Sequence, residues 1–158
     1  MRIAAHGLGA DLPDGWEGAI RAEHAEDLRA AGLAGGRAYP VAHLASFALP
    51  QARGDFGSGA VDHMTAADDF VALLEYGPEE VGTALFSGDG LPRRLDPRTF
   101  SPRALQRTLA WQAGLQHFFS EGGRAFCLYV VLGDAQDVHR HVRSVERVLA
   151  GLEIEERP

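Results

Sequence analysis

The alternation of apolar and polar positions predicts a protein built mainly of β-strands. Residues 70–76 are almost continuously apolar, a pattern typical of a strand that is covered on both faces of a sheet. Residues 16–23 alternate between apolar or small side chains and charged ones, as expected for a half-buried strand. The apolar runs 115–120 and 124–132 are joined by residues 121–123, which end in the favoured hairpin turn Gly-Gly. These strands predict a central, mainly antiparallel sheet with residues 70–76 near its centre.

Valine and leucine recur with helical spacing near the C-terminus. Asp134 offers a side-chain oxygen for an N-cap, and Gly151 marks the expected end of the helix. Between them, apolar residues follow one another at intervals of four, three and four positions: Val138, Val142, Val145 and Leu149. We expect this amphipathic helix to lie against the sheet, because its apolar stripe must be buried. The predicted fold class is therefore α+β, a central antiparallel sheet with helices packed on it.

Glycines and prolines divide the rest of the chain. Additional strands are expected at residues 1–8 and 41–49. The Ala/Gly-rich segment 25–40 is expected to be a mobile loop, and the charged tail 155–158 to be frayed. No repeat or change of composition separates parts of the chain, so we expect a single domain over residues 1–158.

Composition and charge narrow the function classes. The 158 residues are 46% apolar and 23% charged, as in ordinary globular proteins. The sequence has neither the apolar region of a signal peptide nor a run of about 18 apolar residues, so we expect a cytoplasmic protein without a membrane partner. A net charge of −7 opposes binding to nucleic acid. Cys127 is the only cysteine, which excludes an internal disulfide, and we expect it to be buried in the hairpin.

A glycine-rich stretch is one candidate binding site. Gly57, Ser58 and Gly59 follow an expected strand and precede a short expected helix at residues 60–66. Backbone N–H groups in such a loop can bind a phosphate or a carboxylate. The stretch lacks the lysine and the spacing of a P-loop, and a tight structural loop is the alternative interpretation.

Histidine side chains are candidates for metal ligands and for acids or bases. His63 stands close in sequence to four carboxylates that could join it in holding a divalent ion: Asp55, Asp62, Asp68 and Asp69. The alternative is a solvated acidic loop in which the last two serve as turn or cap residues. His139 and His141 are separated by about 200° around a helix, so they cannot share an ion, and we expect both at the surface. The sequence therefore predicts no catalytic residue, no metal and no cofactor.

Basic residues gather in one proline-rich connection of this acidic protein: Arg93, Arg94, Arg98, Arg103 and Arg107. Guanidinium groups recognise carboxylates and phosphates, so this segment is the candidate surface for an unidentified protein partner. A solvated connection is the alternative, because arginine is the only basic residue that this sequence uses apart from histidine. Of the two tryptophans, Trp16 belongs to a patterned strand and is expected in the core, whereas Trp111 could face a cleft.

Short stretches at both ends of the chain resemble the Mog1/PsbP-like family. Residues 12–16, Leu-Pro-Asp-Gly-Trp, are similar to the family's LP-x-GW opening. Residues 123–129 and 148–154 are similar to its closing strand and its VL-x-SL-x-I ending. The stretches LPDGWEG, RGDFGSGAV and GRAFCLYVVLG also resemble uncharacterised proteins of high-G+C actinobacteria. The resemblance implies an antiparallel sheet with helices packed on it and a small binding, adaptor or assembly module, without binding residues that can be carried over.

From these observations we expect a non-catalytic cytoplasmic module that acts through protein–protein interaction. The alternative is a carrier or enzyme for a small anion or a metal, centred on the loop at residues 54–63. The structure can distinguish the two hypotheses, because a catalytic site needs several polar groups directed into one cavity.

Overall fold

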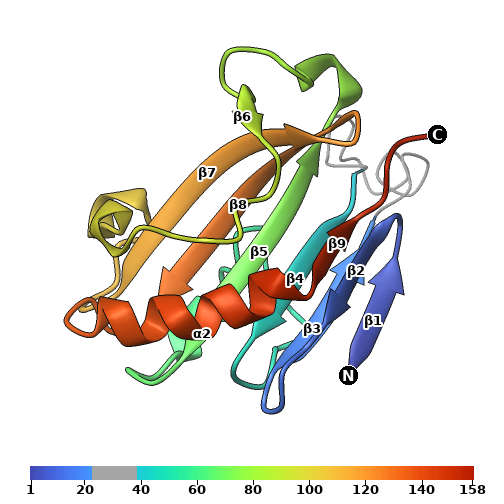
Figure 1. Ribbon diagram of the computed structural model, residues 1–158. Helices are drawn as coiled ribbons and strands as arrows, with labels where there is room; N and C mark the ends of the chain where they lie inside the picture. Colours follow the sequence, from blue (N-terminus) through green and yellow to red (C-terminus); the bar gives the residue numbers. More distant parts are fainter. Residues whose placement is uncertain (23–38) are drawn as a thin grey trace, which may run out of the picture.

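The computed structural model describes residues 1–22 and 39–158 as two β-sheets and one α-helix (Figure 1). The predicted mobile loop at 25–40 lies outside these residues, apart from Tyr39 and Pro40. No helix in the described part of the chain has the length and apolarity needed to cross a membrane.

The larger sheet has six strands and contains most of the predicted elements. Its strands, in spatial order, are β3 (Glu17–Arg21), β4 (Val41–Ala45), β5 (Asp69–Tyr76), β8 (Arg124–Leu132), β7 (Ala113–Glu121) and β6 (Gly88–Asp89). All neighbours are antiparallel except β6, which pairs with β7 in parallel. The α+β class and the mainly antiparallel sheet are confirmed, and β5 lies inside the sheet, as its apolar run predicted.

The smaller sheet has three strands and corrects the prediction for the N-terminus. Its order is β1 (Arg2–Ala5), β2 (Leu8–Asp11) and β9 (Leu152–Ile154). The single strand expected at residues 1–8 is instead a hairpin that turns at His6 and Gly7, whose φ angles are +54° and +74°. The turn was hard to predict from the sequence, because His6 adopts a left-handed backbone conformation that residues other than glycine rarely adopt.

The two faces of the larger sheet are covered by different structures. Alternate residues of β5 and β8 point to each face, so both strands are buried on both sides. On one face, side chains such as Val71 and Leu128 pack with the helix and the smaller sheet. On the other, Phe70, Tyr129 and their neighbours pack with the loops after β4 and before β7. Trp16 is buried at 8% exposure, as predicted.

The one α-helix of the described residues, α2 (Val138–Ala150), lies across the larger sheet (Figure 1). Its buried positions are His141, Val142, Val145, Val148 and Leu149, which share one face. The N-cap prediction was wrong. The helix begins after Asp137, while the Asp134 carboxylate accepts the backbone N–H of Gln136 in the preceding turn.

Other connections contain short 3₁₀ turns: η1 (Val61–His63), η2 (Pro78–Glu80), η3 (Pro97–Thr99) and η4 (Pro102–Ala104). The helix expected at 60–66 is therefore only η1, and the strand expected at 41–49 ends at Ala45. The hairpin turn at Gly122 and Gly123 is confirmed, with φ angles of +61° and +71°. The end of the chain, predicted to be frayed, is bonded: the Arg157 N–H donates to Gly122 O at 2.8 Å.

Candidate functional site

A groove lined by arginines runs between α2 and the segment that precedes η3. Its volume is about 630 Å³, and its lining comprises Arg93, Arg94, Arg140, Arg143, Ser144, Glu146, Arg147 and Ala150. The two walls come from parts of the chain some fifty residues apart, which lie side by side in Figure 1. Five guanidinium groups face one carboxylate in this groove, although the whole protein carries a net charge of −7.

The helix supplies three of these arginines because of its periodicity. Arg140, Arg143 and Arg147 follow one another at intervals of three and four residues, so they share one side of α2. That side is exposed, because the apolar stripe takes the opposite side into the core. With a rise of about 1.5 Å per residue, the first and last of them are separated by about 10 Å along the helix axis.

The other wall is fixed to the end of the helix by hydrogen bonds. The Arg93 guanidinium donates to Leu149 O and, at 2.7 Å, to Leu152 O. A cation at this place satisfies carbonyl groups that the last turn of a helix leaves unpaired. The Leu95 N–H also donates to the Glu146 carboxylate at 2.9 Å, which engages the one acid of the groove. The groove therefore has a defined shape, and Arg93 serves mainly to hold it.

The remaining guanidinium groups are available to a ligand to different degrees. Arg140 donates to the Asp137 carboxylate at 2.5 Å, and this hydrogen bond raises the pKa of Arg140. Within the described part of the chain, Arg94, Arg143 and Arg147 make no side-chain hydrogen bond or ion pair, and all three residues are exposed. Clustered guanidinium groups that are not paired with a carboxylate of the same protein are suited to binding carboxylates or phosphates of a partner.

The structure brings together only two of the five arginines predicted as a partner surface. Arg93 and Arg94 line the groove. Arg98 is instead paired with Asp96 beside it at 3.0 Å, and Arg107 with Asp62 at 3.0 Å. Arg103 is exposed at η4 and outside the groove. The helical arginines of the groove were missed, although their spacing in the sequence was a signal that could have identified them.

The glycine-rich loop is held by contacts within itself. The Gly54 N–H donates to Ser58 O, and the Gly57 N–H to Gly54 O, both at 2.9 Å. Gly57 is buried against Phe70 with a φ of +82°, and a side chain there would overlap the ring. Ser58 is exposed, and Gly59 has a φ of +89°. The positive φ angles of this turn thus explain why positions 57 and 59 are occupied by glycine.

A buried histidine anchors this loop to the sheet. The His43 ring on β4 bonds Asp55 O through Nε2 at 2.7 Å, while its Nδ1 accepts from Arg53 Nε at 2.7 Å. Burial lowers the pKa of His43 to about 4, so the ring is neutral near pH 7. His63 is exposed on η1, and no group of three or more potential metal ligands lies within the described ranges.

Two residues contradict the predictions made for them. His141, expected at the surface, is buried on α2, and its Nδ1 lies 2.6 Å from the Asp69 carboxylate. Asp69, expected in a solvated loop or turn, is the first residue of β5 and is 2% exposed. Burial raises the pKa of Asp69, and hydrogen bonding from His141 opposes that rise. Asp68 does serve as a turn residue, because its carboxylate accepts the Thr65 N–H at 2.8 Å.

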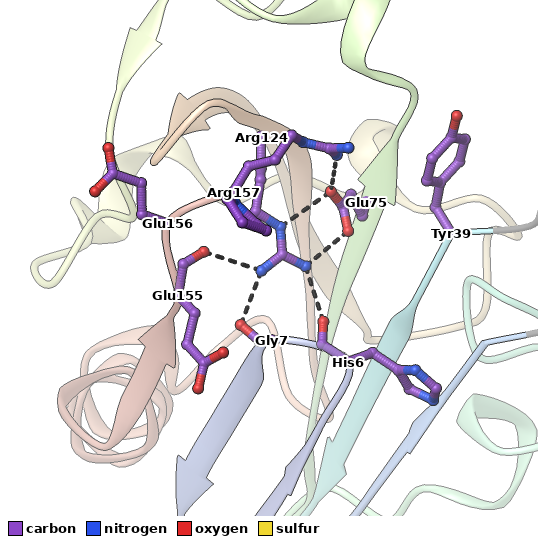
Figure 2. Close-up of a pocket in the computed structure, with 9 residues that line it drawn as sticks. His6, Gly7, Tyr39, Glu75, Arg124, Glu155, Glu156 and Arg157 are labelled. Carbon is purple, nitrogen blue, oxygen red and sulfur yellow. Dashed lines mark hydrogen bonds and ion pairs between the residues drawn. The ribbon is translucent and has the colours of Figure 1, made fainter.

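A second cavity, of about 340 Å³, lies where the two sheets meet (Figure 2). Arg124 on β8 occupies its inner side and pairs with Glu75 on β5 through Nε at 3.0 Å and Nη2 at 2.7 Å. The same guanidinium donates to the carbonyl oxygens of His6, Gly7 and Glu155. These five bonds use all five of its N–H donors, so Arg124 joins the sheets and has no donor left for a ligand. We call this set of contacts the sheet clasp.

Comparisons with protein-family models, curated proteins and solved structures find no match to this chain. The geometry of the described residues is therefore the basis for the proposed function. Of the two cavities, the arginine groove has the larger volume and the free donors.

Proposed function

We propose that this protein is a non-catalytic binding module that docks an acidic segment of a partner protein in its arginine groove. The observation that carries the proposal is the convergence of five guanidinium groups from two distant segments on one groove. Three of them make no hydrogen bond or ion pair within the described residues, and the fourth and fifth are fixed by contacts inside the protein. An anionic ligand would supply the missing partners.

The dimensions of the groove favour an extended peptide. An extended chain advances about 3.3 Å per residue, so carboxylates at alternate positions are about 7 Å apart on one side. A run of four or five residues with alternate Asp or Glu matches the span of about 10 Å between Arg140 and Arg147. Six of the eight residues that line the groove are exposed, which suits a polymer better than a small enclosed ligand.

The histidines with buried rings support binding in preference to acid–base catalysis. Both ring nitrogens of His43 have partners in the protein, and so do both ring nitrogens of His141. A general base must reach the proton that it removes, and these rings are directed into the fold. The proposal keeps the cytoplasmic location expected from the sequence, where acidic segments of other proteins are accessible.

Fluorescence anisotropy with a labelled peptide tests the proposal. The probe contains four Asp residues that alternate with Ser, and its neutral control has Asn in place of each Asp. Exposed ion pairs contribute up to about 1 kcal/mol each, and reversing two charges also adds repulsion, so binding should weaken about tenfold. We expect this loss for the double variant Arg143→Glu/Arg147→Glu, and weaker binding of the unaltered protein at high salt.

Arg103→Glu/Arg107→Glu is the matched control, because it reverses the same number of charges at two exposed positions outside the groove. It should leave the affinity within about twofold, since these side chains do not line the groove and salt screens exposed charges that do not contact the ligand. Equal losses in the control and in Arg143→Glu/Arg147→Glu would contradict the groove as the site. Equal binding of the Asn peptide would contradict recognition of acidic groups.

A further inference from the structure

His141 connects the buried side of α2 with the arginine groove. Its Nδ1 lies 2.6 Å from Asp69 Oδ1 on β5, and its Nε2 lies 3.3 Å from Nη2 of Arg140. Arg140 in turn lines the groove, and its side chain is 52% exposed. Arg140 therefore connects the fully buried imidazole of His141 with the surface that would face the ligand.

The two contacts determine which nitrogen of the ring carries a proton. Arginine is always protonated and can only donate, so Nε2 must be the acceptor of the Arg140 N–H. The single proton of the neutral ring is then on Nδ1, where it is donated to the Asp69 carboxylate. A second proton on Nε2 would point at the guanidinium, so that proton and the bond to Arg140 exclude each other.

We propose that His141 makes ligand binding in the groove dependent on proton binding, by holding Arg140 when its ring is neutral and releasing it when Nε2 is protonated. This inference rests on the proposed function, because it concerns regulation of the same groove. Release would free Nη2 for an anionic ligand, and the new positive charge would strengthen the potential of the groove. Acidic ligands should therefore bind more tightly as the pH falls.

Other charges near the ring act on the same equilibrium. Asp69 from β5 presents its carboxylate to the ring, and Arg140 on α2 presents its guanidinium. Asp137, the residue that precedes α2, attracts the released guanidinium and holds its Nε at 2.5 Å. Asp134 interacts with Arg140 only through its charge, and the Asp68 carboxylate accepts hydrogen bonds from the Ser46 hydroxyl and the Thr65 N–H. The Ser144 side chain, which lines the groove, also hydrogen-bonds the Asp69 carboxylate, whereas the Arg140–His141 bond joins the ring itself to a charged group of the groove.

The test measures binding of the Asp–Ser peptide at pH 8.0 and pH 5.5. The peptide stays mostly ionised over this range, because the pKa of Asp is about 3.9. We expect the affinity of the unaltered protein to rise about fivefold at the lower pH, at the low end of typical couplings between sites. Arg140→Gln should bind more weakly at both pH values and lose most of the rise. His139→Gln changes an exposed histidine of the same helix and should keep it.

Nitrogen-15 NMR of the histidine rings supplies a measurement that does not depend on affinity. It should show the Nδ1–H form of His141 at pH 8.0, and a changed Nε2 signal in Arg140→Gln, where the donor to this nitrogen is missing. An Nε2–H ring at pH 8.0, or an unchanged rise in affinity in Arg140→Gln, would overturn the inference. Binding at both pH values without a difference would overturn it while leaving the proposed function intact. A peptide that binds at neither pH would overturn both.

Discussion

Replacement of Arg124 should destabilise the protein more than replacement of any arginine in the groove. The Arg124 side chain is 7% exposed and the Glu75 side chain 3% exposed, so their ion pair is buried. Arg124→Met removes the guanidinium while keeping an apolar stem of similar length. It leaves a buried carboxylate with fewer partners and removes one donor from each of three carbonyl oxygens, of which Gly7 O keeps the Glu155 N–H.

The expected loss follows from these contacts. Removing one partner of a buried ion pair costs about 3–5 kcal/mol. Arg157 stays within 2.9 Å of Glu75 and is 37% exposed, so it compensates partly. We therefore expect the free energy of unfolding to fall by about 3–4 kcal/mol in Arg124→Met. For a domain of this size, the midpoint of thermal unfolding should fall by about 10 °C.

The double variant Arg124→Met/Glu75→Met separates the charge effect from the loss of the carbonyl contacts. It should be more stable than Arg124→Met alone, because no carboxylate is then left in the interior beside a missing guanidinium. Urea unfolding of the single and double variants, followed by circular dichroism, gives both values. A loss below about 1 kcal/mol for Arg124→Met, or a double variant as unstable as the sum of the single variants, would refute the sheet clasp.

Two further predictions concern stability. The pKa of His43 is about 4 in the folded protein and 6.5 in the unfolded chain, so the unfolded state binds the extra proton first. Stability should be lost as the pH falls from 6.5 towards 4, by up to about 3 kcal/mol, and urea unfolding of His43→Gln should show a smaller pH dependence. Trp16 is 8% exposed and Trp111 is 76% exposed. Thermal unfolding should show a loss of about 3–5 kcal/mol for Trp16→Ala, and a change within about 0.5 kcal/mol for Trp111→Ala; similar losses would contradict the described packing.

Elements with a strong local signal could be predicted from the sequence. The apolar run at 70–76 identified β5, because a strand covered on both faces needs no polar positions. Gly122 and Gly123 identified the β7–β8 turn, since both adopt positive φ angles that glycine tolerates. The hairpin of β1 and β2 was missed, because its turn uses His6 at a position where glycine or asparagine is usual.

The functional residues depended on contacts that no local pattern contains. The pairing of Asp69 with His141 joins positions 72 residues apart, so neither side chain alone indicated burial. One signal was available, because His141 lies three residues after Val138 and four before Val145, within the apolar stripe. The groove likewise required the packing of the Arg93 segment against the end of α2, which the spacing along the chain does not show.

A two-dimensional ¹H–¹⁵N NMR titration with the Asp–Ser peptide tests the arginine groove most directly, because it reports position as well as affinity. We predict the largest shifts at Arg94, Arg143 and Arg147, in their backbone amides and side-chain Nε–H groups, and little change in the loop at residues 54–63. Largest shifts in that loop, or a spectrum unaffected by the acidic peptide, would contradict the proposal that this groove docks an acidic segment.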